Sequence, residues 1–232
     1  MSQVFRSSDR EQTVKNHSVQ KVFVTGGTGY MGRRLIERLV GRGHEVTALA
    51  RKGSEQKLPP NCKVVLGDAL QKDSFAAQVA PADAFVQLVG VAHPSPSKAE
   101  QFRQIDLASV RASVAAAVEA HVPHFVYVSV AQPASMMKEY VAVRAEGESM
   151  IRAAGLNATF LRPWYVLGPG HYWPYLLLPG YWFFELLPSI RTTARRLGLV
   201  TLNQMIAALV DAVEHPPNGV RIVEVPEMKK RK

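Results

Sequence analysis

Four glycines lie within residues 26–32, inside the segment VFVTGGTGYMGRRL (22–35). The segment begins with an apolar, β-branched run and ends with apolar residues at helical spacing, which predicts a strand, a tight turn and a helix. Such a turn directs backbone N–H groups and the positive end of a helix dipole toward an anion. Gly26, Gly29 and Gly32 have the spacing G-x-x-G-x-x-G, and Arg33 follows in place of the lysine of a triphosphate-binding loop. These residues therefore predict a site for the pyrophosphate of a dinucleotide.

The end of the second predicted strand indicates which dinucleotide this site would take. Arg51 and Lys52 stand where an acidic residue would accept a hydrogen bond from the ribose 2′-hydroxyl of NAD. A positive group there suits the 2′-phosphate of NADP, and Arg33 can lie on the same side. We therefore expect NADP as the cofactor. The alternative is that Arg51 only ends a strand in solvent, in which case NAD remains a candidate.

An alternation of strands and helices must position these residues. Apolar runs and helical spacing predict, in order, strand 21–25, helix 31–40, strand 45–50, strand 64–66, strand 85–89, helix 99–120, strand 125–130, helix 139–154, strand 159–161, helix 201–214 and strand 220–225. Most of these strands are continuously apolar, which is typical of a parallel sheet covered on both faces. The expected fold class is α/β, a Rossmann-like doubly wound parallel sheet with helices on both faces and a small C-terminal lobe.

Length and composition indicate one domain with short additions. The 232 residues, 47% of them hydrophobic, suffice for one sizeable core. We expect a flexible lead-in over 1–20, a dinucleotide-binding domain over 21–170, a substrate or lid region over 171–226 packed on the same domain, and a solvated basic tail over 227–232. The net charge of +9 permits attraction to phosphates, but the basic residues are dispersed, so we expect no nucleic-acid partner.

The cysteine and histidine residues bear on location and metal binding. One cysteine, Cys62, cannot form an internal disulfide, and residues 1–20 contain no apolar run of the kind a signal peptide needs. The histidines are scattered, and no spacing of cysteine and histidine predicts a metal site. We therefore expect a cytoplasmic protein without a bound metal.

Residues 171–190, HYWPYLLLPGYWFFELLPSI, concentrate aromatic side chains. Pro174, Pro179 and Glu185 interrupt the segment, so no run approaches the ~20 residues that a membrane span requires. We expect a lobe that covers a hydrophobic small-molecule substrate. Two alternatives remain open: a surface that docks on a membrane or a protein, which the arginines over 191–196 would support, and plain core packing.

Four segments occur in an order and spacing that are similar to those of one protein superfamily. They are VTGGTGYMGRRL, GDALQKDSF, YVSV and YVAVRAEGESMIRAAGLNATFLRPWYVLGPG. Together they resemble the short-chain dehydrogenase/reductase superfamily, and within it the atypical and extended branch, which includes NmrA-like sensors and accessory-subunit relatives of respiratory complex I. The resemblance covers about residues 20–170. It implies a Rossmann-like fold and an NAD(P) cofactor.

The resemblance also implies roles for individual residues at the cofactor. The pyrophosphate would be lined by Gly26, Thr28, Gly29, Tyr30 and Met31. The adenine would meet Asp68 and Ala69, and the riboses would lie over Leu88, Gly90 and Val91. Ser129 would end a strand near the nicotinamide, and the run from Arg162 would close over its carboxamide. Asp68 has an alternative interpretation as a turn residue at a strand end.

The catalytic centre of active members of this superfamily contains a tyrosine followed four residues later by a lysine. Here Tyr140 is followed by Arg144. Arg144 can hydrogen-bond a ribose and place positive charge beside Tyr140, but an arginine stays protonated and cannot relay a proton. Ser129 lies only eleven residues before Tyr140, a shorter gap than in fully equipped members. Tyr140, Arg144 and Ser129 are therefore candidate catalytic residues, and the alternative for Tyr140 is an ordinary aromatic residue at a helix start.

Two functions of different class follow from these residues. The first is an NADP(H)-dependent oxidation, reduction or isomerisation of a hydrophobic carbonyl-type substrate. The second is a non-catalytic dinucleotide-binding sensor or assembly protein with a degenerate active site. Whether the chain is an enzyme stays open, and the resemblance makes a homodimer packed through long helices a candidate assembly.

Overall fold

A seven-stranded parallel sheet forms the centre of the computed structural model, which describes residues 18–134, 136–169 and 197–231. The strand order is β3-β2-β1-β4-β5-β6-β9. The strands are β1 Lys21–Thr25, β2 Glu45–Ala50, β3 Lys63–Leu66, β4 Ala84–Gln87, β5 His124–Val128, β6 Ala158–Arg162 and β9 Val220–Glu224. The chain starts at the middle of the sheet, runs to β3 at one edge, and returns to pair β4 with β1. This reversal is the switch point at which a doubly wound sheet binds its ligand.

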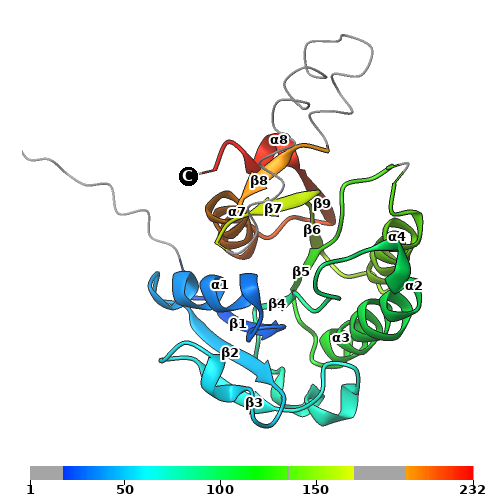
Figure 1. Ribbon diagram of the computed structural model, residues 1–232. Coiled ribbons are helices and arrows are strands. Elements are labelled where there is room, and N and C mark those ends of the chain that lie inside the picture. The colour runs from blue at the N-terminus through cyan, green and yellow to red at the C-terminus, as the bar shows by residue number, and fades with distance from the viewer. Residues whose placement is uncertain (1–17, 135, 170–196, 232) are drawn as a thin grey trace, which may run out of the picture.

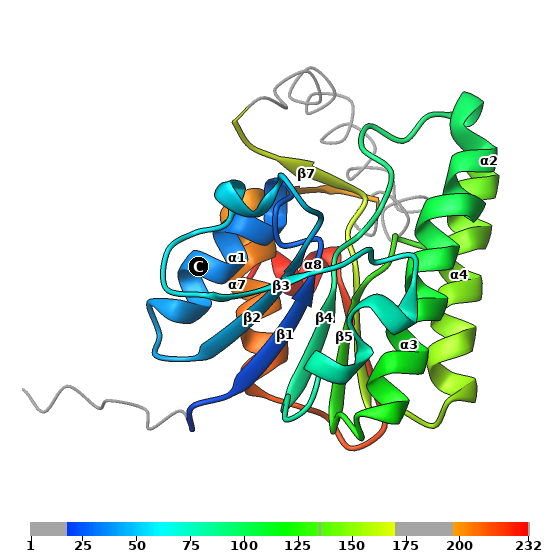
Figure 2. The ribbon, with the colours of Figure 1, turned by 90° about the horizontal axis from the view of Figure 1, so that it is seen from below.

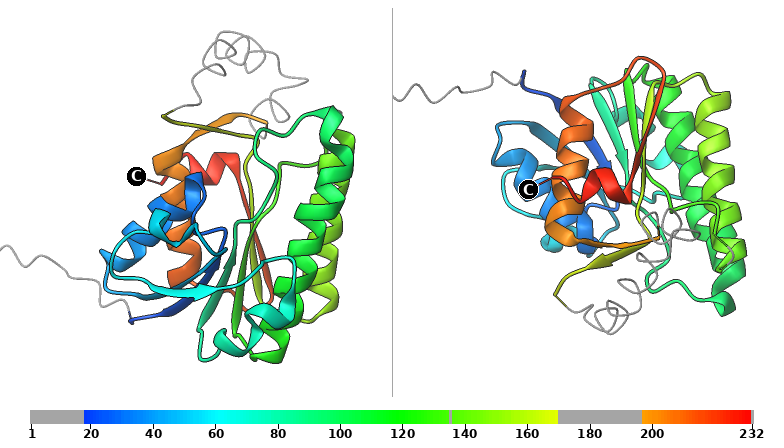
Figure 3. Two further views of the ribbon diagram at one scale, coloured as in Figure 1. Left: turned by 60° about the horizontal axis from the view of Figure 1, so that its bottom comes forward. Right: turned by 90° about the horizontal axis from the view of Figure 1, so that it is seen from above.

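Helices cover both faces of the sheet (Figures 1 and 2). On one face lie α1 (Tyr30–Val40) and α7 (Leu202–Glu214), and on the other lie α3 (Ala108–Glu119) and α4 (Lys138–Ala153). Figure 3 shows the same three layers from two further directions. The expected doubly wound α/β class is confirmed.

Alternation of side chains along the strands divides the core in two. Val22 and Val24 of β1 pack with α1 and α7, whereas Phe23 between them packs with Phe85 and the α3 face. The rings of Phe23 and Phe85 lie 5.2 Å apart, centroid to centroid. Both faces of the sheet are therefore buried, which explains the continuously apolar strands.

Two parts of the fold differ from the predicted elements. The helix predicted over 99–120 is divided into α2 (Ala99–Gln101), a π-helical segment η5 (Phe102–Leu107) and α3. Two strands that were not predicted, β7 (Tyr165–Leu167) and β8 (Leu199–Thr201), pair in parallel as a separate small sheet.

The remaining elements are short helices. They are η1 Glu55–Lys57, η2 Lys72–Ser74, η3 Ala76–Gln78, η4 Pro96–Lys98 and α8 Val225–Met228. Within residues 18–134, 136–169 and 197–231, no helix has the length and apolar character needed to cross a membrane.

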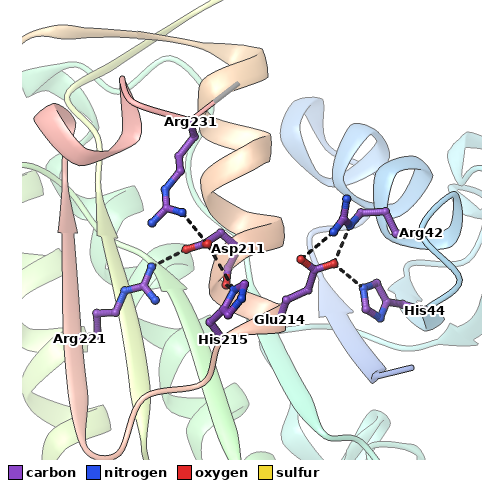
Figure 4. A network of polar contacts seen from close by, with 7 residues as sticks. All are labelled: Arg42, His44, Asp211, Glu214, His215, Arg221 and Arg231. Atoms are coloured by element: carbon purple, nitrogen blue, oxygen red, sulfur yellow. Dashed lines mark hydrogen bonds and ion pairs between the residues drawn. The ribbon is translucent and has the colours of Figure 1, made fainter. Parts of the chain in front are cut away.

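Helix α7 is connected to α1 and β2 through one carboxylate (Figure 4). Arg42, just beyond α1, donates from Nε and Nη2 to Glu214 at 2.6 and 2.9 Å. The buried imidazole of His44 lies 3.1 Å from the same carboxylate. Glu214 therefore joins the end of α7 to the connection between α1 and β2.

One basic residue of the tail over 227–232, which was expected to be solvated, has a carboxylate partner. Arg231 donates from Nη1 to Asp211 of α7 at 2.6 Å, and Asp211 also accepts from Arg221 of β9 at 2.6 Å (Figure 4). Lys229 and Lys230 are exposed as expected. Asp211 lies twenty residues before Arg231, so tail composition alone could not reveal this pair.

Candidate functional site

The glycine loop lies between the end of β1 and the start of α1, beside the end of β4. Gly26 has a φ of +76°, and a Cβ there would lie 2.9 Å from the backbone of Leu88 and Val89. A Cβ at Gly32, in the first turn of α1, would overlap the carbonyl oxygen of Gly26 and lie 2.7 Å from the Cα of Gly27. Both positions therefore require glycine, because the loop packs against backbone on two sides.

The start of α1 adjoins the glycine loop. Gly29 is the N-cap in an extended conformation, and among the described residues no side chain caps it. The first N–H groups of a helix have no partner within the helix, and the first turn of α1 holds no acidic residue to compensate the dipole. A glycine loop at a helix N-terminus fits the pyrophosphate of a dinucleotide.

Residues predicted to recognise the adenosine half lie at the same edge of the sheet. Arg51 directly follows β2 and is exposed. Asp68 follows β3 by two residues, and its Oδ1 accepts from the N–H of Leu70 at 3.0 Å. Asp68 therefore stabilises a turn in addition to its predicted contact with adenine.

In the first turns of α1, Arg34 stacks on Tyr30, with its guanidinium carbon 4.8 Å from the ring centroid.

Arg144 of α4 is buried beneath the end of β4 and β5. It donates from Nη1 to the carbonyl of Val128 at 2.8 Å and from Nη2 to Asp106 at 2.6 Å. A Cβ on Gly90 would overlap Nη2, so the loop after β4 also packs directly on the guanidinium. The structure thus brings Gly90 and Arg144 together, and the contact of each with a ribose stays a prediction.

The partner of Arg144, Asp106, was missed by reasoning from the sequence. It lies in η5 with no exposed surface, and its Oδ2 accepts from the N–H of Val91 at 2.9 Å. Burial raises the pKa of the Asp106 carboxyl above its ordinary value, and Arg144 and the Val91 N–H oppose that rise. The signal in the sequence that could have identified Asp106 was a single carboxylate between the apolar residues Phe102 and Leu107 of a predicted helix.

Two tyrosines flank the Arg144 guanidinium. Its central carbon lies 5.2 Å from the ring centroid of Tyr140 and 5.8 Å from that of Tyr127. Tyr140 is half-buried and packs against Phe102, with ring centroids 5.0 Å apart. Tyr127 is fully buried, and burial raises its pKa to about 12 against the opposing effect of Arg144. Tyr127 therefore stays protonated at neutral pH, and Tyr140 is the phenol at the edge of this cluster.

Ser129, the third candidate catalytic residue, is directed toward a different partner. Its hydroxyl donates to Oε1 of Glu148 at 2.6 Å, one helical turn beyond Arg144 on α4. Glu148 also accepts from Gln132 at 2.8 Å and from Arg162 at 2.9 and 2.6 Å. The carboxylate of Glu148, another residue that sequence reasoning missed, therefore joins the ends of β5 and β6.

Residues 171–190 and the arginines over 191–196 lie outside the described residues. Trp164 and Tyr165 follow Arg162, with their rings 6.0 Å apart.

Comparisons with known proteins agree with this arrangement. The chain is 25% identical over 211 residues to a ceramide reductase from Caulobacter vibrioides, covering 90% of this chain and 65% of that protein. A 3-beta-hydroxysteroid dehydrogenase from Mycolicibacterium neoaurum is 31% identical over 113 residues, covering 46% of this chain and 31% of that protein. The chain therefore spans between about a third and two thirds of the length of these curated relatives.

The fold is similar to that of solved dinucleotide-binding enzymes. The crystal structure of the Bordetella bronchiseptica enzyme WbmH in complex with NAD+ superposes with a TM-score of 0.67 at 20% identity, covering 89% of this chain and 76% of that chain. Residues 26–169, more than half of the chain, match the family described as NAD(P)H-binding. This match starts at the glycine loop and includes Arg51, Asp106, Tyr140 and Arg144. The chain belongs to this NAD(P)H-binding family.

Proposed function

We propose that this protein binds NADP(H) at the carboxyl ends of its strands and uses it to interconvert a hydrophobic carbonyl compound and its alcohol. The observation that carries the proposal is the position of Tyr140 over the fixed guanidinium of Arg144, at 5.2 Å, beside the loop that follows β4. The names of the relatives, a ceramide reductase and a hydroxysteroid dehydrogenase, support a large apolar substrate.

In the reducing direction, bound NADPH would supply a hydride to the carbonyl carbon. Tyr140 would donate its hydroxyl proton to the carbonyl oxygen and recover a proton from solvent, so that ketone, NADPH and one proton give alcohol and NADP+. Arg144 would favour the transient phenolate by its charge, but it would not relay the proton, because arginine does not deprotonate.

The preference for NADP over NAD is part of the proposal. Arg51 is exposed after β2, and within the described part of the chain it forms no ion pair with a carboxylate. Arg33, in the first turn of α1, is also exposed. Two uncompensated guanidinium groups near the expected adenosine ribose support recognition of a 2′-phosphate.

A second candidate function is dinucleotide binding without catalysis. It is favoured by the hydrogen bond from Ser129 to Glu148, at 2.6 Å, which directs the serine hydroxyl toward a structural carboxylate. The replacement of lysine by arginine at position 144 also favours it. Such a protein would act as a sensor or an assembly factor, as the NmrA-like and complex I relatives imply.

Calorimetric titration with NADPH and NADH tests the cofactor part of the proposal. We expect NADPH to bind more tightly, and Arg51→Ala to weaken NADPH binding by about tenfold or more while leaving NADH unchanged, because a charge-assisted bond to the 2′-phosphate is lost. Arg38→Ala removes an exposed arginine in the last turn of α1, at the end opposite the glycine loop, and serves as the matched control. Equal affinities for both dinucleotides, unaffected by Arg51→Ala, would contradict NADP selectivity.

Turnover of a panel of ketones and quinones with NADPH separates the two candidate functions. Tyr140→Phe is expected to lower kcat by about 100-fold or more while NADPH affinity stays within about twofold, because only the proton donor is lost. If the wild-type protein binds NADPH but converts none of the panel, the non-catalytic function is favoured. If Tyr140→Phe is as active as the wild type, the role of Tyr140 as proton donor is contradicted.

A further inference from the structure

The side chain of Tyr30 connects the glycine loop to the small sheet of β7 and β8. Tyr30 is the first residue of α1, directly after the N-cap Gly29, so its backbone lies at the expected pyrophosphate site. Its ring and Val166 of β7 pack against the apolar cluster that contains Val200 of β8. One residue therefore has its backbone in the expected cofactor site and its ring against two strands from the C-terminal part of the chain.

The end of β7 is closely fitted to the Tyr30 ring. A Cβ on Gly168, which follows β7, would overlap the hydroxyl oxygen of Tyr30 and lie 3.1 Å from the Cβ of Leu202 at the start of α7. Gly168 is not among the described glycines with a positive φ, so its backbone conformation is open to other residues. A glycine is therefore needed at position 168 because the phenol occupies the space that a side chain would take.

Arg34 fixes the same ring from within α1. Its Nη1 donates to the carbonyl oxygen of Tyr30 at 3.0 Å, and its guanidinium carbon lies 4.8 Å from the ring centroid. The hydroxyl oxygen of Tyr30 is buried. Movement of β7 away from α1 would expose that end of the ring and remove its packing against Gly168 and Leu202.

We propose that Tyr30 is a positioning residue that couples occupancy of the pyrophosphate site to the sheet of β7 and β8. The inference rests on the proposed function, because it takes a dinucleotide as the ligand of the glycine loop. Phosphate oxygens that accept from N–H groups at the start of α1 fix the backbone of Gly29 and Tyr30. Local opening of β7 and β8 unseats the Tyr30 ring and loosens that backbone, so a bound dinucleotide disfavours the opening.

Hydrogen exchange with and without NADPH measures this coupling. NADPH at a concentration that calorimetry shows to be saturating is expected to slow exchange in β7 and β8 of the wild type by about tenfold or more, because a ligand of the closed state suppresses opening by mass action. If NADH is the tighter dinucleotide, it replaces NADPH. Exchange in β9, which pairs with β6 of the main sheet, is the internal control for global stability.

Tyr30→Ala removes the ring and keeps the backbone N–H. NADPH should therefore still saturate the variant, but its effect on exchange in β7 and β8 should fall below about twofold, because opening no longer disturbs the loop. The response of β9 to NADPH should be the same in the variant and the wild type. A role of Tyr30 in stability alone would instead raise exchange with and without NADPH by the same factor.

The contact between Tyr30 and Gly168 offers a matched set of variants. Gly168→Ala should displace the Tyr30 ring and lose the effect of NADPH on β7 and β8. Tyr30→Phe removes only the oxygen that the new Cβ would overlap, so it should keep the effect. Because substitutions of residues in contact are non-additive, Tyr30→Phe combined with Gly168→Ala should regain most of the effect that Gly168→Ala alone loses.

The other outcomes distinguish the coupling from the proposed function. The coupling is overturned if NADPH binds the wild type without slowing exchange in β7 and β8, or if Tyr30→Ala responds like the wild type. It is also overturned if Gly168→Ala causes the same loss with Tyr30 and with phenylalanine at position 30, a comparison that decides the matter should Tyr30→Ala not fold. Failure of the wild type to bind either dinucleotide would instead overturn the proposed function.

Discussion

The two halves of the candidate site differ in which part of the residues forms them: backbone in one half and side chains in the other. At the start of α1 the site consists of backbone, and Gly26 and Gly32 contribute by having no side chain. Beneath the end of β5 it consists of buried charged side chains, with Arg144 held by Asp106 and Ser129 held by Glu148. The first half excludes side chains, and the second requires particular ones.

This difference determines what each half depends on. The glycine loop closes within seven residues, and its hydrogen bond from Gly29 N–H to the Gly26 carbonyl is local. The ion pair of Arg144 spans 38 residues and the hydrogen bond of Ser129 spans 19. The backbone half therefore depends on local conformation, whereas the side-chain half depends on the assembled fold.

The largest loss of stability is expected from Glu148→Ala. Glu148 is 4% exposed and accepts from Ser129, Gln132 and Arg162, so its removal leaves a largely buried guanidinium without a counter-ion. We expect the free energy of unfolding to fall by about 3–5 kcal/mol, measured by urea unfolding followed by circular dichroism.

A carboxylate on the same helix provides the matched control for this variant. Glu146 is exposed and lies 3.9 Å from Arg103, so Glu146→Ala should change the free energy of unfolding by about 0.5 kcal/mol or less. Similar losses in the free energy of unfolding for the two variants would contradict the claim that a buried carboxylate stabilises the fold more than an exposed one.

A second effect concerns a buried histidine at the opposite end of β5. His124 lies 3.0 Å from the Thr159 hydroxyl, and burial, followed by the charge of Arg221, lowers its pKa to about 4. Because the folded pKa lies below the unfolded value, the stabilisation is complete above pH 6.5 and is lost as the pH falls toward 4. We expect a loss on the order of 3 kcal/mol between pH 7 and pH 4.

The contribution of His124 is isolated by comparison with a variant that does not titrate. His124→Gln should lose less stability than the wild type over the same pH range, in urea unfolding at pH 7, 5.5 and 4. Parallel pH dependences for the two proteins would assign the loss to other groups.

The smallest loss of stability, but a complete loss of ligand binding, is expected from Gly32→Ala. The added Cβ would overlap the Gly26 carbonyl, and relieving that overlap should cost about 1–3 kcal/mol. Displacement of the loop should abolish binding of both NADPH and adenosine 2′,5′-bisphosphate in calorimetry. Gly41→Ala, at the right-handed C-cap of α1, is the control and should keep both ligands bound.

Most of the sheet could be predicted from the sequence, because its strands, like the glycine loop, depend on local sequence patterns rather than on contacts between distant segments. Apolar runs placed β1 and β2 at their observed bounds, and they placed β4 and β5 within a few residues, because a strand buried on both faces is a local pattern. The glycine loop was identified for the same reason. Its residue roles, and those of Asp68, Arg51 and Tyr140, stay predictions.

What could not be predicted depends on contacts between distant segments. The sequence contains Asp106 and Glu148 without any pattern that pairs them with Arg144 and Ser129. The interruption of the helix over 99–120 by η5 and the ion pair of Arg231 with Asp211 have the same origin. Each is a consequence of tertiary packing that overrides local periodicity.

The position of α7 has a consequence for how the protein is made. Its residues Leu202, Met205, Ile206 and Leu209 complete the apolar cluster on the α1 face of β1 and β4. During synthesis from the N-terminus, β1, β4, β5 and β6 are finished about forty residues or more before α7 begins, and β9 follows α7. Throughout that interval the apolar surface that α7 covers would be exposed, and we expect a chain released before residue 202 to aggregate more readily than the full chain.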